Sequence, residues 1–349
     1  MIKESTQPAE KFTVPNSEGK HGPTAALKNP ALAQKLLEAF DAVFGLHPGF
    51  RPAHAKGLMC SGTFTPSPEA AKLTRASHAS RSSTPVTVRY SDSTGLPNIP
   101  DNDPGKSGPR GMAVRFHLDE HVHTDIIAHS TDGFPVRTGE EFLGFLRAAA
   151  AFGAGRPEEM GAFLAGHPNA KRFVETPKPI PASFALEAFF AVTSFKFTNA
   201  NGASRHGRFR IRPDGGTEHL TDEVAAGKSE NFLFDEIAQR LAKGPVKLGV
   251  FVQIAEPGDD VADSSVPWPA SRAEIPFGTI TLTARADDQL PERQKIIFDP
   301  IPRIDGIDPS GDPLSEVRAD IYLLSGRRRR AALSDGGQQG QSPGRPTKV

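Results

Sequence analysis

The sequence predicts an α+β fold in which an antiparallel β-barrel is surrounded by helices. Strand-like runs gather into two groups, 57–128 and 194–286, with a helical region between them. Strands collected into groups favour an antiparallel barrel, whereas regular alternation with helices would favour a parallel sheet. The chain of 349 residues can bury a large core, and barrel proteins of this length are often single domains.

The first half of the chain is expected to begin with an extended or mobile arm. Residues 1–22 are polar and contain proline, so they offer little apolar surface to bury. A helix is expected at 31–44, where Leu32, Leu36, Leu37 and Phe40 fall on one side. The first strand group is expected at 57–64, 86–91, 111–118 and 125–128.

The second half of the chain is expected to hold further helices and the second strand group. Helices are expected at 140–152 and 157–165, and strands follow at 194–198, 207–212, 246–255 and 275–286, with a helix at 231–241. A last helix is expected at 313–328. After Arg330 the chain is rich in Gly, Gln, Ser and Pro, so 331–349 is expected to be disordered. The main domain is therefore assigned to 23–330.

Composition excludes several classes of partner. The chain has 41 basic and 41 acidic residues, so no charge excess favours nucleic acid or an anionic membrane. No apolar run approaches the roughly 20 residues of a membrane span. The amino terminus lacks the apolar core of a signal peptide, which predicts a cytoplasmic protein, or a periplasmic one if a leader was removed. One Cys allows no intrachain disulfide and no Cys-rich metal site.

Residues 318–322 read Arg-Ala-Asp-Ile-Tyr within the last predicted helix. Their spacing puts Arg318 and Tyr322 on one helix face. A phenol with a pKa near ~10 is a poor metal ligand until it ionises, and a nearby guanidinium stabilises the phenolate. Phenolate is one of the proximal ligands of haem iron. For this motif taken alone, simple packing of an amphipathic helix is the alternative.

A second group of residues could handle a proton. A peroxide bound to ferric haem needs its proton moved from the inner to the outer oxygen, and a neutral His54 can take and return it. Ser91 could hydrogen-bond the other ring nitrogen and fix the tautomer. Arg51 and Arg89 suit a haem propionate, since guanidinium binds carboxylate in two places. A structural role is the alternative for His54 taken alone.

These segments, together with the rest of the chain, resemble the catalase superfamily, and specifically its short members, the catalase-related peroxidases. The run G-P-R-G-M-A-V-R-F at 108–116 resembles the family's R-G-F-A-V-K-F, and F-K-F-T-N-A-N-G at 195–202 resembles F-K-L-V-N-A-N-G. The run D-S-S-V-P-W-P at 263–269 resembles D-x-T-x-x-W-P, with Ser in place of Thr. Phe-Asp-Pro at 298–300 and Gly-Ile-Asp-Pro-Ser at 306–310 resemble the F-D-P and G-I-E-P-S before the proximal helix. The match is collinear from about 50 to 329.

The resemblance implies an eight-stranded barrel of catalase type, with haem b (iron protoporphyrin IX) held between the barrel and the proximal helix. It implies that His54 is the distal catalytic residue with Ser91 as its partner, and that Tyr322 is the axial iron ligand. Arg318 would support the phenolate. The residues implied to contact the propionates or the porphyrin ring are Arg51, Arg89, Arg329 and Phe142, with core packing as the alternative for Phe142.

One position departs from the family pattern. Full catalases carry an Asn in an Asn-Asn-Thr-Pro run after the corresponding strand, where it helps to position a second peroxide. Here 125–133 reads Asp-Ile-Ile-Ala-His-Ser-Thr-Asp-Gly, so His129 takes that place. We therefore expect peroxide cleavage with weak disproportionation. The alternative for His129 is a solvent-facing turn residue.

Three other features invite a functional interpretation but favour a structural one. His117, His121 and His123 are expected at a turn between two strands, not in a metal site. Arg327–Arg330 could bind nucleic acid, although a helix end partly committed to propionates fits the balanced charge better. Cys60 is expected to be a small buried strand residue.

The sequence thus predicts a haem peroxidase that takes hydrogen peroxide or organic peroxides and a small reducing co-substrate. It predicts no nucleic-acid partner and no membrane insertion, and allows a homo-oligomer. The alternatives are a true catalase, an enzyme that rearranges fatty-acid hydroperoxides, and a haem-binding or sensing module without turnover.

Overall fold

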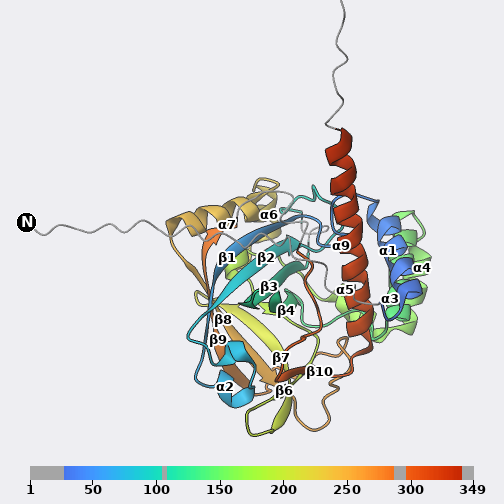
Figure 1. Cartoon of the computed structure of the whole chain (residues 1–349). Helices are drawn as coiled ribbons and strands as arrows, with labels where there is room; N and C mark the ends of the chain where they lie inside the picture. The colour runs from blue at the N-terminus through green and yellow to red at the C-terminus, as the bar shows by residue number, and fades with distance from the viewer. Residues whose placement is uncertain (1–26, 104–107, 287–295, 340–349) are drawn as a thin grey trace, which may run out of the picture.

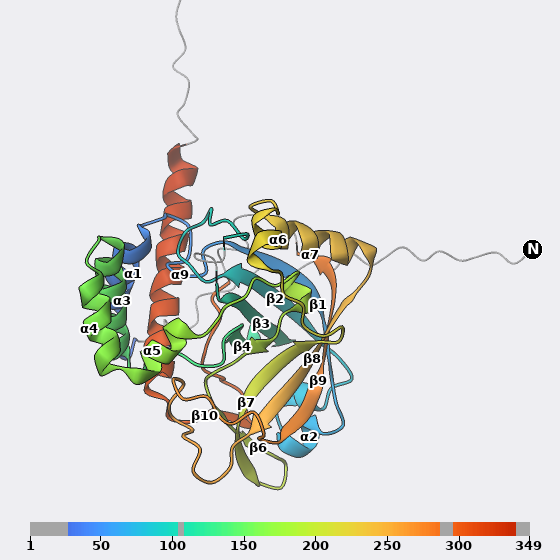
Figure 2. The same ribbon diagram turned by 180° about the vertical axis from the view of Figure 1, so that it is seen from behind.

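Figures 1 and 2 show the computed structural model of the chain, which describes residues 27–103, 108–286 and 296–339. The predicted arm at 1–22 lies outside the described residues. A β-barrel occupies one side of the molecule, and a layer of helices lies against it on the other. No described helix combines the length and the apolar character that crossing a membrane requires.

Eight strands close into an antiparallel barrel, as predicted. Their order around the ring is β7–β5–β4–β3–β2–β1–β9–β8, and β8 pairs with β7 to close it. The strands are β1 (Gly57–Pro66), β2 (Thr84–Asp92), β3 (Arg110–Asp119), β4 (Val122–His129), β5 (Phe189–Phe190), β7 (Ser204–Pro213), β8 (Val246–Ile254) and β9 (Glu274–Arg285). Two four-stranded meanders thus meet through the pairs β1–β9 and β4–β5.

One of the eight strands that close the barrel differs from the prediction. The predicted strand 194–198 is β6 (Phe195–Thr198), which pairs with β7 and β10 (Ile307–Pro309), outside the closed ring. The ring position is filled by β5, which also pairs with β7. Residues 191–194 separate the two short strands, so they form an interrupted edge along β7. A strand of two residues shows no alternation, and the sequence pattern therefore missed β5.

The alternation of side chains along β2 determines which of its residues point away from the barrel core. Val86, Val88 and Tyr90 on β2 belong to the apolar cluster inside the barrel. Because successive side chains of a strand point to opposite faces, Arg89 and Ser91 project from the outer face. Both are nevertheless buried, since the helical layer covers this part of the barrel.

Three helices form a second apolar cluster beside the barrel. They are α1 (Pro30–Phe44), α3 (Gly139–Gly153) and α9 (Pro313–Gln339), and α9 stands between the barrel and the other two (Figures 1 and 2). Thr138 and Glu141 form a capping box that fixes the start of α3. Gly139 permits the close approach of α3 to α9, because an added Cβ would lie 3.0 Å from Val317 Cγ1.

The remaining helices are short or lie at the periphery. They are α2 (Ala70–Leu73), α4 (Pro157–Gly166), α5 (Pro168–Glu175), α6 (Asp222–Ala226) and α7 (Phe232–Lys243), with 3-10 turns at Ser77–Ala79 and Phe184–Leu186. Of the α-helices in this group, only α4 and α7 were predicted. The prediction of disorder from 331 is wrong for 331–339, because α9 continues to Gln339. Ala331, Ala332 and Leu333 are strong helix formers that extend the helix past Arg330.

Candidate active site

A cavity of about 530 Å³ lies between the outer face of the barrel and the helices α1, α3 and α9. Its wall is mostly apolar, and its volume falls within the roughly 300–1,000 Å³ of small-molecule and cofactor sites. Every residue predicted to form the site lines this cavity. They are Arg51, His54, Arg89, Ser91, His129, Phe142, Arg318, Tyr322 and Arg329.

His54 lies just before β1 in a left-handed backbone conformation with φ of 56°. Such a conformation is uncommon for residues other than glycine and gathers at functional sites. Two contacts hold this backbone: the His54 amide donates to the Ser93 carbonyl at 3.1 Å, and Arg89 Nη2 donates to the His54 carbonyl at 2.8 Å. Arg89 thus fixes the main chain that carries the imidazole.

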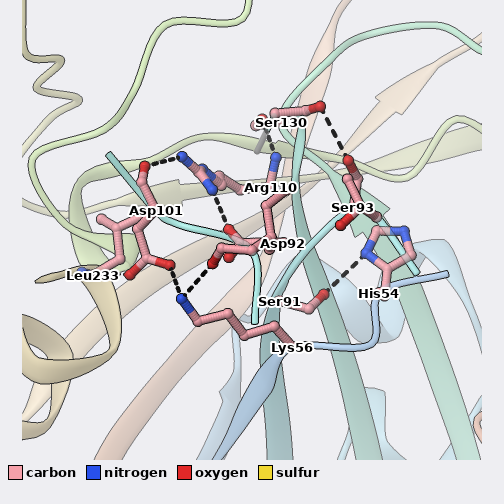
Figure 3. Close-up of polar contacts among 12 residues, drawn as sticks. His54, Lys56, Ser91, Asp92, Ser93, Asp101, Arg110, Ser130 and Leu233 are labelled. Carbon is pink, nitrogen blue, oxygen red and sulfur yellow. Dashed lines mark hydrogen bonds and ion pairs between the residues drawn. The ribbon is translucent and has the colours of Figure 1, made fainter. Parts of the chain in front are cut away.

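The His54 Nδ1 and Ser91 Oγ atoms are 3.0 Å apart, as Figure 3 shows. This is the predicted pair. Because it involves Nδ1, the other ring nitrogen, Nε2, remains for contact with a molecule in the cavity that His54 lines. Gly111 on β3 makes the pairing possible, because a Cβ there would come within 2.5 Å of both His54 Nδ1 and Ser91 Oγ. A glycine inside a strand often marks such a close approach, which is the signal that could have identified Gly111.

The surroundings of His54 keep its imidazole neutral. Burial lowers the pKa of His54, and the neighbouring Arg89, His129, Arg51 and Arg318 add to this effect, so that the pKa falls to about 3. A neutral imidazole can accept a proton at neutral pH. The cavity therefore holds a base in its reactive form.

His129 is the second imidazole of the cavity. It ends β4, and the Thr131 amide donates to its Nδ1 at 3.3 Å, so neutral His129 carries its proton on Nε2. Burial, followed by the charges of Arg318 and Lys178, lowers its pKa to about 4. The alternative interpretation of His129 as a solvent-facing turn residue is wrong.

One face of α9 supplies the opposite wall. Tyr322 and Arg318 lie one turn apart, and Arg318 Nη2 donates to Tyr322 Oη at 3.4 Å. Arg318 Nη1 donates to Thr193 Oγ1 at 2.9 Å, a contact that no sequence pattern indicated. The guanidinium is therefore held between the helix and the interrupted edge of the barrel.

Positive charge is concentrated at one end of the cavity. Arg51 Nη2 and Arg329 Nη2 both donate to the Ile296 carbonyl, at 3.1 and 3.2 Å. Burial lowers the pKa of Arg51 well below its usual value, and the neighbouring charges of Arg89 and Arg329 lower it further. Among the described residues, Arg329 Nε is buried and has no hydrogen-bond partner. This arrangement suits an anionic ligand.

Phe142 belongs to an aromatic wall of the cavity. Its ring centroid lies 5.7 Å from Phe40, 5.1 Å from Phe134 and 6.4 Å from Phe145. Phe142 therefore packs in the helical core and faces the cavity at once, so the two predicted roles are compatible.

Of the other features noted in the sequence, Cys60 and the three histidines His117, His121 and His123 do not line the cavity. Cys60 is fully buried in β1, and burial raises the pKa of its thiol to about 12. His117 Nε2 pairs with Thr87 Oγ1 at 2.9 Å, His121 is exposed, and the described residues contain no cluster of three metal-ligating side chains. In the Arg327–Arg330 run, Arg328 pairs with Asp41 on α1.

A buried network of charges lies beside His54 and Ser91 (Figure 3). Lys56 Nζ contacts Asp101 Oδ1 at 2.5 Å, and Arg110 pairs with Asp92 and donates to the Asp101 carbonyl. Each charged residue is close in sequence to a residue of the cavity: Lys56 lies two positions after His54, Asp92 follows Ser91, and Arg110 precedes Gly111. The network therefore ties together the backbone that carries the two site residues.

A closed eight-stranded barrel with a phenol and an imidazole in one cavity under its covering helices matches the architecture implied by the sequence resemblance. The chain belongs to the catalase family, whose sequence model matches residues 8–333.

Named relatives and solved structures agree with this assignment. The chain is 34% identical over 298 residues to the catalase-related peroxidase of Mycolicibacterium paratuberculosis, which covers 84% of this chain and 94% of that protein. It is 30% identical over 305 residues to the catalase-related peroxidase of Synechococcus elongatus, covering 86% and 89%. Catalase A of Saccharomyces cerevisiae superposes with a TM-score of 0.70 at 21% identity, over 92% of this chain and 68% of that one, and so shares the fold.

Proposed function

We propose that this protein is a haem-dependent peroxidase, which cleaves hydrogen peroxide or organic peroxides and oxidises a small reducing co-substrate. The observation that carries the proposal is the meeting, in one cavity, of the His54–Ser91 pair and the Arg318–Tyr322 pair. Two relatives with 30% identity or more carry the name catalase-related peroxidase, which supports the same activity.

The residues of the cavity fit haem b. The wall is apolar, as the porphyrin requires, and the buried arginines with the unsatisfied Arg329 Nε provide donors for the two propionates. In this proposal Tyr322 binds the iron and Arg318 stabilises its phenolate. Arg51, Arg89 and Arg329 hold the propionates, and Phe142 lies against the ring. Residues 23–330 then form the haem domain.

Haem, when bound, supplies the iron that binds peroxide and the redox chemistry that splits its O–O bond. The chain itself moves the proton. With Nδ1–H donating to Ser91 Oγ, His54 Nε2 can take the proton of the inner peroxide oxygen. The same nitrogen returns it to the outer oxygen, which leaves as water or an alcohol. Ser91 keeps the ring in the tautomer that this transfer needs.

His129 supports peroxidase activity in preference to disproportionation. It replaces the amide side chain of full catalases with a bulkier imidazole whose Nε2–H is its remaining donor. We infer that a second hydrogen peroxide is positioned poorly, so that a reductant completes the cycle. Oxygen release from hydrogen peroxide alone then stays weak.

The absorption spectrum of the haem-loaded ferric protein, before and after one equivalent of peroxide, tests the proposal. We expect a phenolate-type high-spin spectrum that changes on addition of peroxide. The variant His54→Ala should keep the first spectrum and lose the reaction by about 10²–10⁴-fold. A haem-sensing module would take up haem and give the same weak peroxide response with and without His54.

We also propose a cytoplasmic location and no nucleic-acid partner, and the proposal allows a homo-oligomer. The balanced charge of the chain supports the absence of a nucleic-acid partner. Cell fractionation and sedimentation of the haem-loaded protein would test location and assembly.

A further inference from the structure

The gap in the barrel edge between β5 and β6 brings a hydroxyl group to α9. Thr193 lies in this gap and is 5% exposed, and its neighbour Val192 lines the cavity. Thr193 Oγ1 accepts a hydrogen bond from Arg318 Nη1 at 2.9 Å. The interruption of the strand therefore connects the barrel to the helix that carries Tyr322.

This contact is the better of the two that orient Arg318. Among the described residues, the guanidinium donates to Thr193 at 2.9 Å and to Tyr322 at 3.4 Å, and the second distance is long for a hydrogen bond. An arginine side chain has high rotamer entropy, so a fixed acceptor is needed to aim its planar group. The β-branched Thr193 is itself stiff about χ1, which makes it a suitable anchor.

The position of Arg318 matters beyond Tyr322. Its charge adds to the effect of burial in lowering the pKa values of His54 and His129. A guanidinium that swung away from Tyr322 would therefore change the field across the whole cavity. Thr193 is the protein acceptor that opposes this movement.

We propose that Thr193 is a positioning residue for the proximal side of the haem site, acting through Arg318 on Tyr322. The inference rests on the proposed haem function. Outer groups that orient a metal ligand typically contribute 10–100-fold to metal affinity. Thr193 acts one contact further out, so we expect an effect near the lower end of that range.

The experiment compares four haem-loaded proteins: wild type, Thr193→Val, Thr193→Ser and Ser194→Ala. Thr193→Val keeps the shape and removes the acceptor, so haem dissociation measured by transfer to apomyoglobin should be about tenfold faster. The charge-transfer band of the ferric protein should shift with it. Thr193→Ser keeps the acceptor and should stay within about twofold of wild type.

Ser194→Ala is the matched control. Ser194 lies in the same gap, is 1% exposed, and its Oγ has no partner among the described residues. Its removal should leave haem dissociation and the band unchanged. Equal losses in Thr193→Val and Ser194→Ala would overturn the proposal, because the gap would then act through packing alone.

Wild-type behaviour of Thr193→Val would overturn it as well. A wild-type protein that takes up no haem would instead contradict the proposed function, so the two failures are distinguishable. A double-mutant cycle with Arg318→Lys adds an internal check. If Thr193 acts through Arg318, the effects of the two changes on haem dissociation should fall short of additivity.

Discussion

Two imidazoles of low basicity share the cavity, and their environment decides how each can act. His54 has its Nδ1 against Ser91, so Nε2 can exchange a proton. His129 accepts a backbone N–H at Nδ1, so in its neutral form it presents a donor. One side chain is suited to proton transfer, and the other to holding an oxygen atom in place.

The low pKa of His54 predicts the pH dependence of peroxide cleavage. An ordinary imidazole is half protonated near pH 6.5, whereas the His54 pKa is lowered to about 3. The base should therefore stay active as the pH falls, and the rate of the first peroxide reaction should be flat between pH 5 and 8. Stopped-flow measurements would show this, and a midpoint near pH 6.5 would contradict the assigned electrostatics.

Replacing the second imidazole by an amide should change the balance of activities. His129→Asn restores the side chain that full catalases carry at this place. We expect oxygen release from hydrogen peroxide to rise by about tenfold while oxidation of a dye substrate changes less, since a bound peroxide gains an amide partner. An oxygen electrode and a dye assay on the same preparation measure both. Unchanged oxygen release would show that His129 does not limit disproportionation.

At the scale of residues, the sequence identified those groups whose chemistry is specific. The positions of His54, Tyr322 and the arginines in one cavity could be predicted because the motifs around them, in their order along the chain, resemble the catalase superfamily. Thr193 and the Ile296 carbonyl could not, since their roles depend on contacts between segments more than 30 residues apart in the chain. Threonine and a backbone oxygen carry no comparable signal.

At the scale of elements, β1, β2 and β3 are locked together beside the site by buried charges. Asp101 is fully buried and receives Lys56 Nζ and the amide of Leu233 at the start of α7. Such a network gives little net stability when complete. It becomes costly when one partner is lost and the other remains buried.

Lys56→Met should therefore destabilise the protein by about 3–5 kcal/mol, because Asp101 would lose a cation within a buried site. Denaturant unfolding measures this free energy. Lys72→Met is the control, since Lys72 and Glu69 form an exposed pair whose loss should cost at most about 1 kcal/mol. Equal costs for the two substitutions would show that the buried network is not coupled to stability.

A histidine in the barrel core makes folding sensitive to acid. His78 packs among Phe64, Phe116 and Phe277, and burial lowers its pKa to about 4. The unfolded chain, with a pKa near 6.5, binds the proton more tightly, so stability is highest above pH 6.5 and falls as the pH drops toward 4. The shift corresponds to about 3 kcal/mol.

His78→Phe should remove this part of the acid sensitivity, which unfolding curves at pH 7 and pH 4.5 would reveal. The exposed His121 gives the control as His121→Asn, which should leave the difference between the two curves unaltered. A His78→Phe protein as acid-sensitive as wild type would assign the loss of stability to other groups.

The elements themselves were predictable where they are long and periodic. The runs that became β1 to β4 and β7 to β9 alternate or are rich in apolar residues, and α1, α3 and α9 have apolar stripes. The closing strand was not predictable, because β5 has two residues and its pairing is set by β4 and β7. The end of α9 was placed too early, because composition suggested a loop where alanine and leucine continue the helix.

At the scale of the whole molecule, a cavity of about 530 Å³ separates the two apolar clusters. The helical layer contacts the barrel around this space, so a ligand that fills it should join the two layers. Haem is expected to raise the unfolding free energy by about 4 kcal/mol at a concentration a thousandfold above its dissociation constant. Calorimetry of the apo and haem-loaded proteins measures the shift, and equal melting temperatures would exclude a ligand that bridges the layers.

The length of α9 also limits how this chain can vary. Arg318, Tyr322, Ser325 and Arg329 lie along one stripe of a single helix, and three of them have different tasks in the proposed site. One inserted residue would turn everything beyond it by about 100° and carry it about 1.5 Å along the axis. The number of residues between Arg318 and Arg329 is therefore fixed by the site, and an insertion or deletion between them should disrupt it even where every site residue is kept.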